Sequence, residues 1–363
     1  MTETTPSARQ PGVTRQRCSR CVLSAPFPNI KFDDEGVCNF CRDEVGARSD
    51  DTAIDRGRVR VMDLLAAQKA RKATYDAVLC NSGGKDSSYT LKLAVEKYGL
   101  TVLSFTLDNG FVAPAARDNI HRVVDALGVD HITVRPALNV FKPVVRAASL
   151  LPIYGEQSLT RISAGCNACI SLVNTTALRL ALEKDIPFIL AGFTLGQIPA
   201  NGIVYRNHYR FLAESREASM ARLRDAVGEE VDRLYEVPDS VIDRAPAYPY
   251  NINLLCLESL TEAQILAEVG KLGWKLPSGL DGCSSNCMLN TFNNYVHQRR
   301  HGYSPYELEL SHLVRKRLMT RSEALAKLAD QPLEQLPYLV KSLALSPEDL
   351  ATLGLLADGQ VAG

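Results

Sequence analysis

Residues 80–88 read Cys-Asn-Ser-Gly-Gly-Lys-Asp-Ser-Ser, a set of residue types suited to binding phosphate. Glycines let the backbone approach an anion closely, the lysine adds a cation, and the serines add hydroxyl donors. A short apolar run at 75–79 precedes this stretch, and apolar positions at helical spacing follow at 89–95. A glycine turn between a strand and a helix directs free backbone N–H groups and the helix dipole at a phosphate. The predicted phosphate-binding residues are Ser82, Gly83, Gly84, Lys85, Asp86, Ser87 and Ser88.

This stretch is not a Walker A loop, because Asp86 follows the lysine and no glycine lies five residues before Gly84. It resembles the signature of the PP-loop ATP pyrophosphatases, the adenine nucleotide α-hydrolase-like superfamily. The resemblance implies ATP and Mg²⁺ as cofactors, cleavage of ATP between its α and β phosphates, and adenylation of a substrate oxygen. We therefore predict that Lys85 steadies the phosphates, and that Asp86 holds Mg²⁺ or orients the attacking group. A surface turn rich in small residues is the alternative.

Four cysteines near the N-terminus form two Cys-x-x-Cys pairs separated by sixteen residues: Cys18, Cys21, Cys38 and Cys41. This spacing suits two knuckles that place four thiolates around one Zn²⁺, with a small β-hairpin between them. Closed Cys₄ sites are usually structural, so we predict a role in folding and docking. Four unrelated buried thiols, or a redox role for either pair, are the competing interpretations.

Both ends of the chain carry a further resemblance. Residues 17–23 and 30–41 resemble the start of the N-acetyl sugar amidotransferase family, which places such a zinc knuckle before a PP-loop domain. A predicted capping box, with Thr320 as N-cap and Glu323 three residues later, begins a helix in a segment that resembles the tail of that group. This resemblance implies amide or amine transfer with ammonia.

A second set of cysteines comprises Cys166, Cys169, Cys283 and Cys287. A mid-domain Cys-x-x-Cys with a later cysteine after a proline turn is similar to the tRNA thiolation enzymes of the same superfamily. The similarity implies that Cys166, Cys169 and either Cys283 or Cys287 hold a [4Fe–4S] cluster, which leaves one iron open to carry sulfur. A second structural zinc site, a persulfide-carrying catalytic thiol at Cys166 or Cys169, and simple packing are the alternatives.

Alternating strands and helices must position these residues. Further strands are predicted at 101–107, 131–134 and 188–192, with helices at 114–127 and 173–184. This alternation predicts an α/β fold, a parallel sheet with helices on both faces of the PP-loop or HUP-like kind. Ligands bind at the carboxyl ends of such strands. Gly192 and Thr194 are therefore candidate contacts to pyrophosphate or substrate, with an ordinary turn as the alternative. The PP-loop resemblance places Asp108 beside the adenine and ribose.

The predicted organisation has five parts. They are a disordered tail at 1–16, a zinc knuckle at 17–45, a linking helix at 46–74, a PP-loop ATP pyrophosphatase domain at 75–290 and a helical C-terminal region at 291–363.

The charge balance and the absence of long apolar runs limit the classes of binding partner that we expect. The chain has 41 basic and 41 acidic residues, so no overall field favours nucleic acid or an anionic membrane. Neither an apolar run of about 18 residues nor a signal-peptide h-region is present, which predicts a cytoplasmic protein without membrane contact. In that compartment ten cysteines indicate metal or catalysis rather than disulfides.

The sequence thus predicts an ATP-dependent sulfurtransferase that adenylates a substrate oxygen and replaces it with sulfur. The alternatives are an amidotransferase that uses ammonia on an N-acetyl sugar or a similar small molecule, and a zinc-bearing nucleotide sensor or RNA-binding subunit without turnover. The expected substrate is a small molecule or a group bound to protein or RNA. A sulfur donor or a glutaminase is the expected partner, and a homodimer is possible.

Overall fold

The computed structural model describes residues 16–43, 47–68, 73–357 and 360–361. The predicted tail therefore lies outside the described residues except for its last position.

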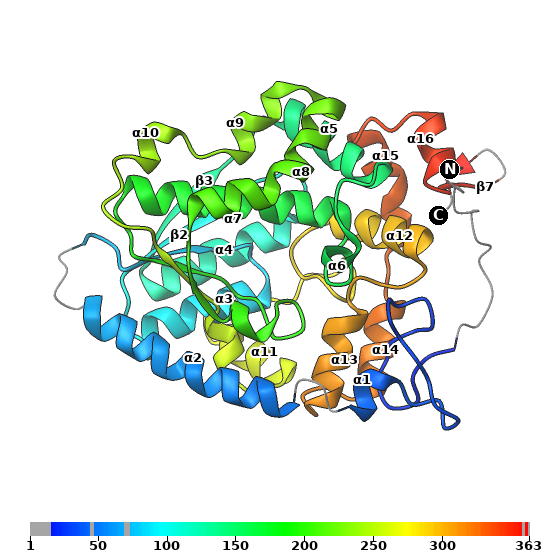
Figure 1. Cartoon of the computed structure of the whole chain (residues 1–363), viewed down its shortest axis with the longest axis horizontal. Helices are drawn as coiled ribbons and strands as arrows, with labels where there is room; N and C mark the ends of the chain where they lie inside the picture. Colours follow the sequence, from blue (N-terminus) through cyan, green and yellow to red (C-terminus); the bar gives the residue numbers. More distant parts are fainter. Residues whose placement is uncertain (1–15, 44–46, 69–72, 358–359, 362–363) are drawn as a thin grey trace.

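A six-stranded sheet forms the centre of the molecule, in the order β3-β2-β1-β4-β6-β5 (Figure 1). Its strands are β1 (Ala77–Cys80), β2 (Val102–Leu107), β3 (Asp130–Val134), β4 (Phe188–Leu190), β5 (Val204–Arg206) and β6 (Tyr250–Ile252). All neighbours pair in parallel except β5 and β6, which are antiparallel. The predicted parallel α/β sheet is thus confirmed, with one antiparallel strand at its edge.

Helices cover both faces of the sheet, so successive residues of β1 are buried in different cores on its two sides. Leu79 packs in one core with α2 (Ala47–Gln68), α3 (Lys85–Lys92), α4 (Pro114–Leu127) and α11 (Glu262–Gly270). Val78 packs in another core with α7 (Ala164–Glu183) and α10 (Asp239–Ile242). A strand that is buried on both faces has a continuous apolar run in its sequence, and this run is why β1 and β2 could be predicted.

The chain reverses direction across the sheet at β1. From β1 it proceeds to β2 and β3 on one side, and then crosses back to β4 on the other. In open α/β sheets the ligand crevice lies where the strand order reverses, at the carboxyl ends of the strands. This rule places the site at the ends of β1 and β4.

Helices also dominate the C-terminal region, as predicted. They are α12 (Leu289–His301), α13 (Glu307–Arg315), α14 (Arg321–Ala329), α15 (Leu336–Ser342) and α16 (Pro347–Thr352). Helices α12, α15 and α16 share an apolar core with α5 (Leu138–Leu150), α7 and α8 (Tyr209–Val227). The predicted capping box is present, since Thr320 accepts from the N–H of Glu323 and the Glu323 side chain accepts in return.

Shorter elements complete the described chain. They are α1 (Asn39–Arg42), α6 (Glu156–Leu159), α9 (Asp232–Tyr235), a π-helix η1 (Leu93–Lys97), the 3₁₀ turns η2 (Ala200–Gly202), η3 (Glu229–Val231), η4 (Leu254–Leu257) and η5 (Leu333–Gln335), and the pair β7 (Leu356–Ala357) and β8 (Gln360–Val361). Within the described ranges, no helix combines the length and apolar content that crossing a membrane requires.

Two features differ from the sequence prediction. Strands β5 and β6 have three residues each and lie in polar-aromatic stretches, so they carry little periodicity. Helix α7 begins at Ala164 rather than near residue 173. Its first turns, Ala-Gly-Cys-Asn-Ala-Cys, lack large apolar residues that would reveal a helical period.

Candidate functional site

The glycine-rich loop follows β1 and leads into α3, the setting predicted for phosphate binding. Gly84 is the N-cap of α3 and Lys85 its first residue. Gly83 has a φ of +77°, and a Cβ there would lie 2.2 Å from the carbonyl oxygen of Ala116. This position therefore requires glycine.

Polar groups inside the loop fix its shape. Asn81, which the sequence prediction did not single out, accepts hydrogen bonds from the Gly83 N–H (3.1 Å) and the Ser87 hydroxyl (3.3 Å). The Ser82 N–H donates to Ser87 Oγ (3.2 Å). Ser88 is fully buried, so its side chain faces the core rather than the loop's outer side.

Lys85 and Asp86 form an ion pair at the start of α3, with 2.7 Å between Nζ and Oδ2. Burial alone would lower the pKa of Lys85, but the carboxylates of Asp86, Glu262 and Glu309 together raise it above its usual value. Lys85 therefore stays protonated beside these carboxylates, and its positive charge suits it to pair with a phosphate.

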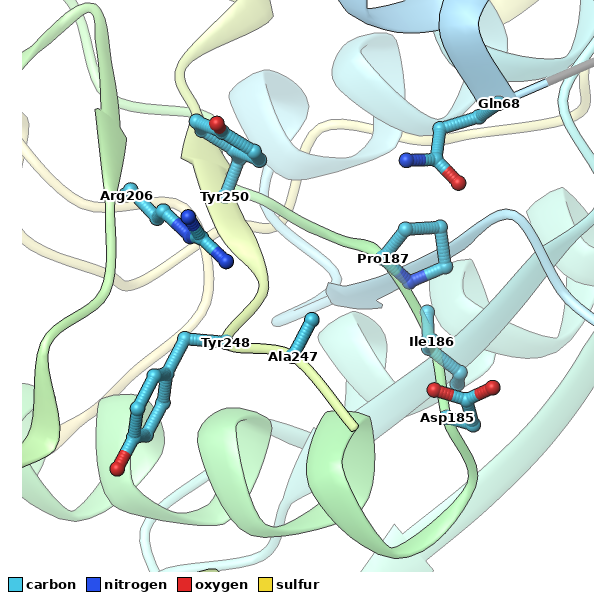
Figure 2. Close-up of a pocket in the computed structure, with 8 residues that line it drawn as sticks. All are labelled: Gln68, Asp185, Ile186, Pro187, Arg206, Ala247, Tyr248 and Tyr250. Atoms are coloured by element: carbon cyan, nitrogen blue, oxygen red, sulfur yellow. The ribbon is translucent and has the colours of Figure 1, made fainter. Parts of the chain in front are cut away.

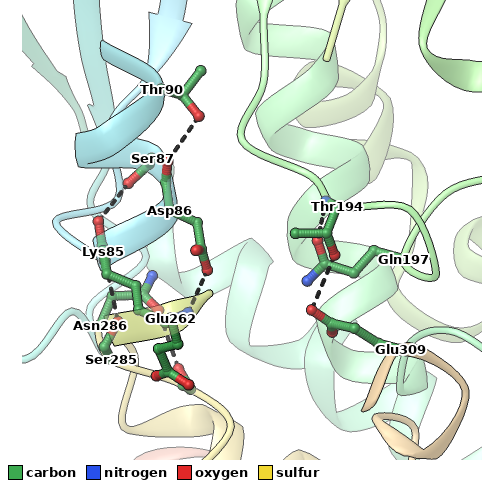
Figure 3. A network of polar contacts seen from close by, with 12 residues as sticks. Lys85, Asp86, Ser87, Thr90, Thr194, Gln197, Glu262, Ser285, Asn286 and Glu309 are labelled. Carbon is green, nitrogen blue, oxygen red and sulfur yellow. Dashed lines mark hydrogen bonds and ion pairs between the residues drawn. The ribbon is translucent and has the colours of Figure 1, made fainter. Parts of the chain in front are cut away.

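The turn after β4 faces this pair from the other side (Figure 3). A Cβ on Gly192 would lie 3.0 Å from the Asp86 carbonyl oxygen, so β4 approaches α3 closely. The Thr194 hydroxyl donates to Glu309 Oε1 at 3.1 Å, and the Thr194 N–H donates to Gln197 Oε1 at 2.9 Å. Glu309 belongs to α13, more than two hundred residues from the loop in sequence, so sequence reasoning missed it.

Asp108 lies directly after β2, at the same edge of the sheet. Its carboxylate pairs with Arg117 (3.4 Å) and with Arg135. It also accepts the Gly110 N–H at 3.1 Å. In this structure these partners engage the carboxylate of Asp108. Its contact to adenine and ribose stays a prediction.

The second cysteine set divides in two. Asn109 lies next to both Cys169 and Cys287, with its Nδ2 atom 3.4 Å and 3.8 Å from their sulfurs. Asn293 Nδ2 donates to Cys166 Sγ at 3.1 Å. Cys283 instead faces the Lys327 carbonyl oxygen (3.7 Å) and packs with residues of the C-terminal helices. Cys169 and Cys287 thus share Asn109, Cys166 lies close enough to act electrostatically on both, and Cys283 lies apart from them.

Burial raises the pKa of all three neighbouring thiols, and that of Cys287 reaches about 11. Their mutual repulsion adds to the effect, since Cys287 and Cys166 each raise the pKa of Cys169. Hydrogen bonds from asparagine amides oppose it. Ligation of a metal or cluster would require these thiols as thiolates, since a metal displaces the proton. Among the described residues, the sulfurs that lie within 4.8 Å of one another as a group of three or more are those of the N-terminal cysteines.

A short segment connects this cysteine group with the loop. The Lys85 N–H donates to Ser285 Oγ at 3.3 Å, and Cys287 follows two residues later. Cys287 forms an isolated β-bridge with Val112, which fixes it beside the end of β2. Residues 285–287 therefore touch the loop at one end and reach the thiols at the other.

The N-terminal cysteines form a buried group able to hold a metal. Cys18, Cys21, Cys38 and Cys41 place their sulfurs within 4.8 Å of one another. The Sγ–Sγ distances are 3.9 Å for Cys18 and Cys41, and 3.7 Å for Cys21 and Cys38. A tetrahedron with Zn–S bonds of about 2.3 Å has an edge of about 3.8 Å, so the set fits zinc.

Backbone geometry supports this fit, because the N–H groups of Arg20, Cys21 and Cys38 point at Cys18 Sγ from 3.3 to 3.4 Å. The predicted hairpin is reduced to isolated bridges, such as Phe32 with Cys38. The knuckle has a small apolar cluster that includes Leu23, Phe27 and Val37, and we expect a bound metal to add to its folding energy.

The knuckle docks on the C-terminal helices. Glu307 is fully buried and pairs with Arg17 at 3.0 Å. It also accepts from the N–H and hydroxyl of Ser24, at 2.9 and 2.8 Å. Arg321 donates to the carbonyl oxygens of Cys18 and Cys21. The knuckle therefore contacts α13 through Glu307 and the start of α14 through Arg321.

A separate cavity of about 230 Å³ lies at the opposite, amino-terminal edge of the sheet (Figure 2). Its lining includes Pro187 before β4, Arg206 at the end of β5, and Tyr250 at the start of β6. The cavity therefore lies away from the glycine loop, which follows the carboxyl end of β1.

Comparisons with known proteins give distant matches. No protein-family model matches the chain. An uncharacterized protein of Methanocaldococcus jannaschii is 24% identical over 181 residues, 49% of this chain, and the chain spans 59% of that relative's length. The solved U34-tRNA thiolase NcsA from Methanococcus maripaludis with its [4Fe-4S] cluster is 14% identical, with a TM-score of 0.36. That alignment covers 92% of this chain and 90% of the thiolase. At these values neither match assigns an activity.

Proposed function

We propose that this protein is an ATP-dependent enzyme that adenylates a substrate oxygen and replaces that oxygen with sulfur. The observation that carries the proposal is the path of residues 285–287, which contact the Lys85 N–H at one end and place Cys287 with Cys169 at the other. Activation and sulfur chemistry would then share one edge of the sheet.

The glycine loop supplies the first half of this reaction. The N-terminal end of α3 and Lys85 bind the triphosphate with Mg²⁺, which Asp86 helps to hold. The substrate oxygen attacks the α phosphorus in line, and pyrophosphate leaves. A sulfur nucleophile then attacks the adenylated carbon, and AMP departs.

Cys166, Cys169 and Cys287 fit a [4Fe–4S] cluster as three thiolate ligands, and such a cluster supplies an open iron that can carry sulfur. The amides of Asn109 and Asn293 already donate to these sulfurs and would stabilise their anionic forms. In the N-terminal knuckle we infer a structural zinc.

A second candidate is amide or amine transfer from ammonia. The buried four-cysteine knuckle favours it, because the resemblance to N-acetyl sugar amidotransferases rests on those residues. Ammonia in place of sulfur would need no cluster.

Anaerobic purification with iron and acid-labile sulfide analysis tests the proposal. We expect a brown protein with about four irons and four sulfides per chain. Cys166→Ser, Cys169→Ser and Cys287→Ser should each bleach it yet leave ATP binding intact. Cys283→Ser is the matched control and should stay brown, because Cys283 faces away from the group.

Turnover separates the candidates. With MgATP and sulfide, bulk transfer RNA should yield AMP and thiolated product. AMP formation from N-acetylglucosamine with ammonia, by a protein that stays colourless and iron-free after anaerobic reconstitution, would replace sulfur transfer with nitrogen transfer. ATP binding without AMP from either substrate would favour the nucleotide-sensing alternative.

A further inference from the structure

Glu309 lies at the edge of the sheet that carries the glycine loop, although it belongs to the C-terminal region. Figure 3 shows it beside Thr194 and Gln197, across from Lys85 and Asp86. The Thr194 hydroxyl donates to its Oε1 atom at 3.1 Å. Two neutral groups from the turn after β4 therefore orient this carboxylate.

The backbone around Glu309 is built for this close approach. Gly196 has a φ of +107°, and a Cβ there would lie 3.0 Å from Glu309 Cα. On the other face of α13, Glu307 is clamped by the knuckle through Arg17 and Ser24. Residues two apart on a helix point to nearly opposite sides, so α13 is held between the knuckle and the turn after β4.

Three carboxylates surround Lys85, and they differ in their partners. Asp86 pairs with Lys85 at 2.7 Å, and Glu262 pairs with Lys327 at 2.9 Å. Glu309 is hydrogen-bonded by the neutral Thr194 and Gln197. A buried carboxylate held by neutral donors rather than by an ion pair binds a proton more readily, which suits a general base.

We propose that Glu309 is the general base of the adenylation step, which accepts the proton that an amide or lactam substrate loses. This inference rests on the proposed function and names its substrate class. When the carbonyl oxygen of such a substrate bonds to the α phosphorus, the bond from phosphorus to pyrophosphate breaks. The N–H proton passes to the Glu309 carboxylate, the N–H electron pair forms the C=N bond, and the product is a neutral O-adenylyl imidate. Glu309 returns the proton to solvent after AMP leaves.

The electrostatic setting agrees with this role. Burial and Asp86 raise the pKa of Glu309 to about 7, against the opposing effects of Lys85, Thr194 and Gln197. A base with a pKa near the working pH transfers protons most effectively. The titratable or charged groups that act on Glu309, or on which it acts, are Lys85 and Asp86 on α3, Cys283 before α12 and Tyr306 before α13. Farther along α13 lies His312, which Arg315, Lys316 and Arg161 influence, and Arg161 donates to the Gly196 carbonyl oxygen.

The test compares Glu309→Gln, Glu309→Asp and the exposed surface control Glu334→Gln. Wild-type AMP formation, with MgATP and bulk transfer RNA or N-acetylglucosamine, should fall as pH drops below about 7, because the carboxylate must be ionised. Glu309→Gln should lose about 100-fold or more of the rate and also this pH step. Glu309→Asp should recover part of the rate, and Glu334→Gln should match wild type. Glu309→Gln activity within about threefold of wild type, with the same pH step, would overturn the proposal.

A second readout needs no substrate turnover. Trp274 is the chain's single tryptophan, and its Nε1 donates to the Gly83 carbonyl oxygen at 2.9 Å, so its fluorescence reports MgATP at the loop. Relative to Glu309→Gln, wild-type affinity should weaken as pH rises through 7, because ionised Glu309 repels the phosphates. Identical pH dependence in both proteins would overturn the role of Glu309. Failure of the proposed function has a different signature, the absence of AMP from wild-type protein itself.

Discussion

Gly83 and Gly99 both adopt positive φ angles, of +77° and +65°, but their surroundings differ. A Cβ at Gly83 would collide with the Ala116 backbone, whereas nothing lies within 4 Å of one at Gly99. Alanine substitutions at the two glycines therefore distinguish the cost of backbone strain alone, at Gly99, from strain plus a steric collision, at Gly83.

We predict that Gly99→Ala costs about 1 kcal/mol of unfolding free energy, from the strained φ alone. Gly83→Ala should cost about 2 to 4 kcal/mol, because overpacking against Ala116 adds to the strain. It should also weaken MgATP binding. Urea unfolding and Trp274 fluorescence measure both effects. Equal losses in the two variants would show that Ala116 yields without cost.

The ion pair at the start of α3 leads to a second prediction. Lys85→Ala and Asp86→Ala should each abolish AMP formation and leave the thermal midpoint almost unchanged, because a partly exposed pair contributes little to stability. Lys97→Ala, which removes the surface pair with Glu258, is the control and should keep full activity. Wild-type AMP production by either loop variant would reject the PP-loop assignment.

At the scale of elements, the four-cysteine knuckle packs against α13. Glu307 and Ser311 on α13 meet the knuckle, since Ser311 Oγ accepts the Val22 N–H at 3.3 Å. Glu309, between them in sequence, faces the opposite way toward Thr194. Loss of the knuckle's metal should therefore loosen the helix that carries Glu309.

We expect Cys18→Ser to remove one metal per chain, to lower the thermal midpoint and to reduce AMP formation, because metal binding supplies the folding energy of this loop. Cys256→Ser is the matched control, since Cys256 is a buried lone cysteine outside both groups. Metal analysis and calorimetry measure the change. Full metal content in Cys18→Ser would reject the knuckle as the binding site.

Local patterns made part of this arrangement predictable. The strand–glycine–helix unit, the spacing of the knuckle cysteines and the capping box at Thr320 all depend on residues close in sequence. Long-range placement left no such signal. Glu309 is an ordinary helical glutamate until α13 packs against the turn after β4. Cys287 is distinguished from Cys283 by long-range contacts, its bridge to Val112 and its approach to Asn109.

At the scale of the whole molecule, the N-terminal knuckle and α13 meet beside the edge of the sheet that carries the glycine loop. The N-terminal knuckle packs on α13 and α14, and Tyr303, which precedes α13, stacks edge-on with Phe27 of the knuckle at 5.1 Å. Helices α12, α15 and α16 share a core with α5 and α7. The knuckle and the C-terminal helices therefore pack together, and α13 carries Glu309 to the turn after β4.

The proposed reaction cleaves ATP between its α and β phosphates. ATP labelled at its α phosphorus, incubated with Mg²⁺, sulfide and bulk transfer RNA, tests it most directly. Wild-type protein should release labelled AMP together with pyrophosphate, and Lys85→Ala should release neither. Labelled ADP with free phosphate from wild-type protein would contradict the account, because it would place the cleavage at the β–γ bond.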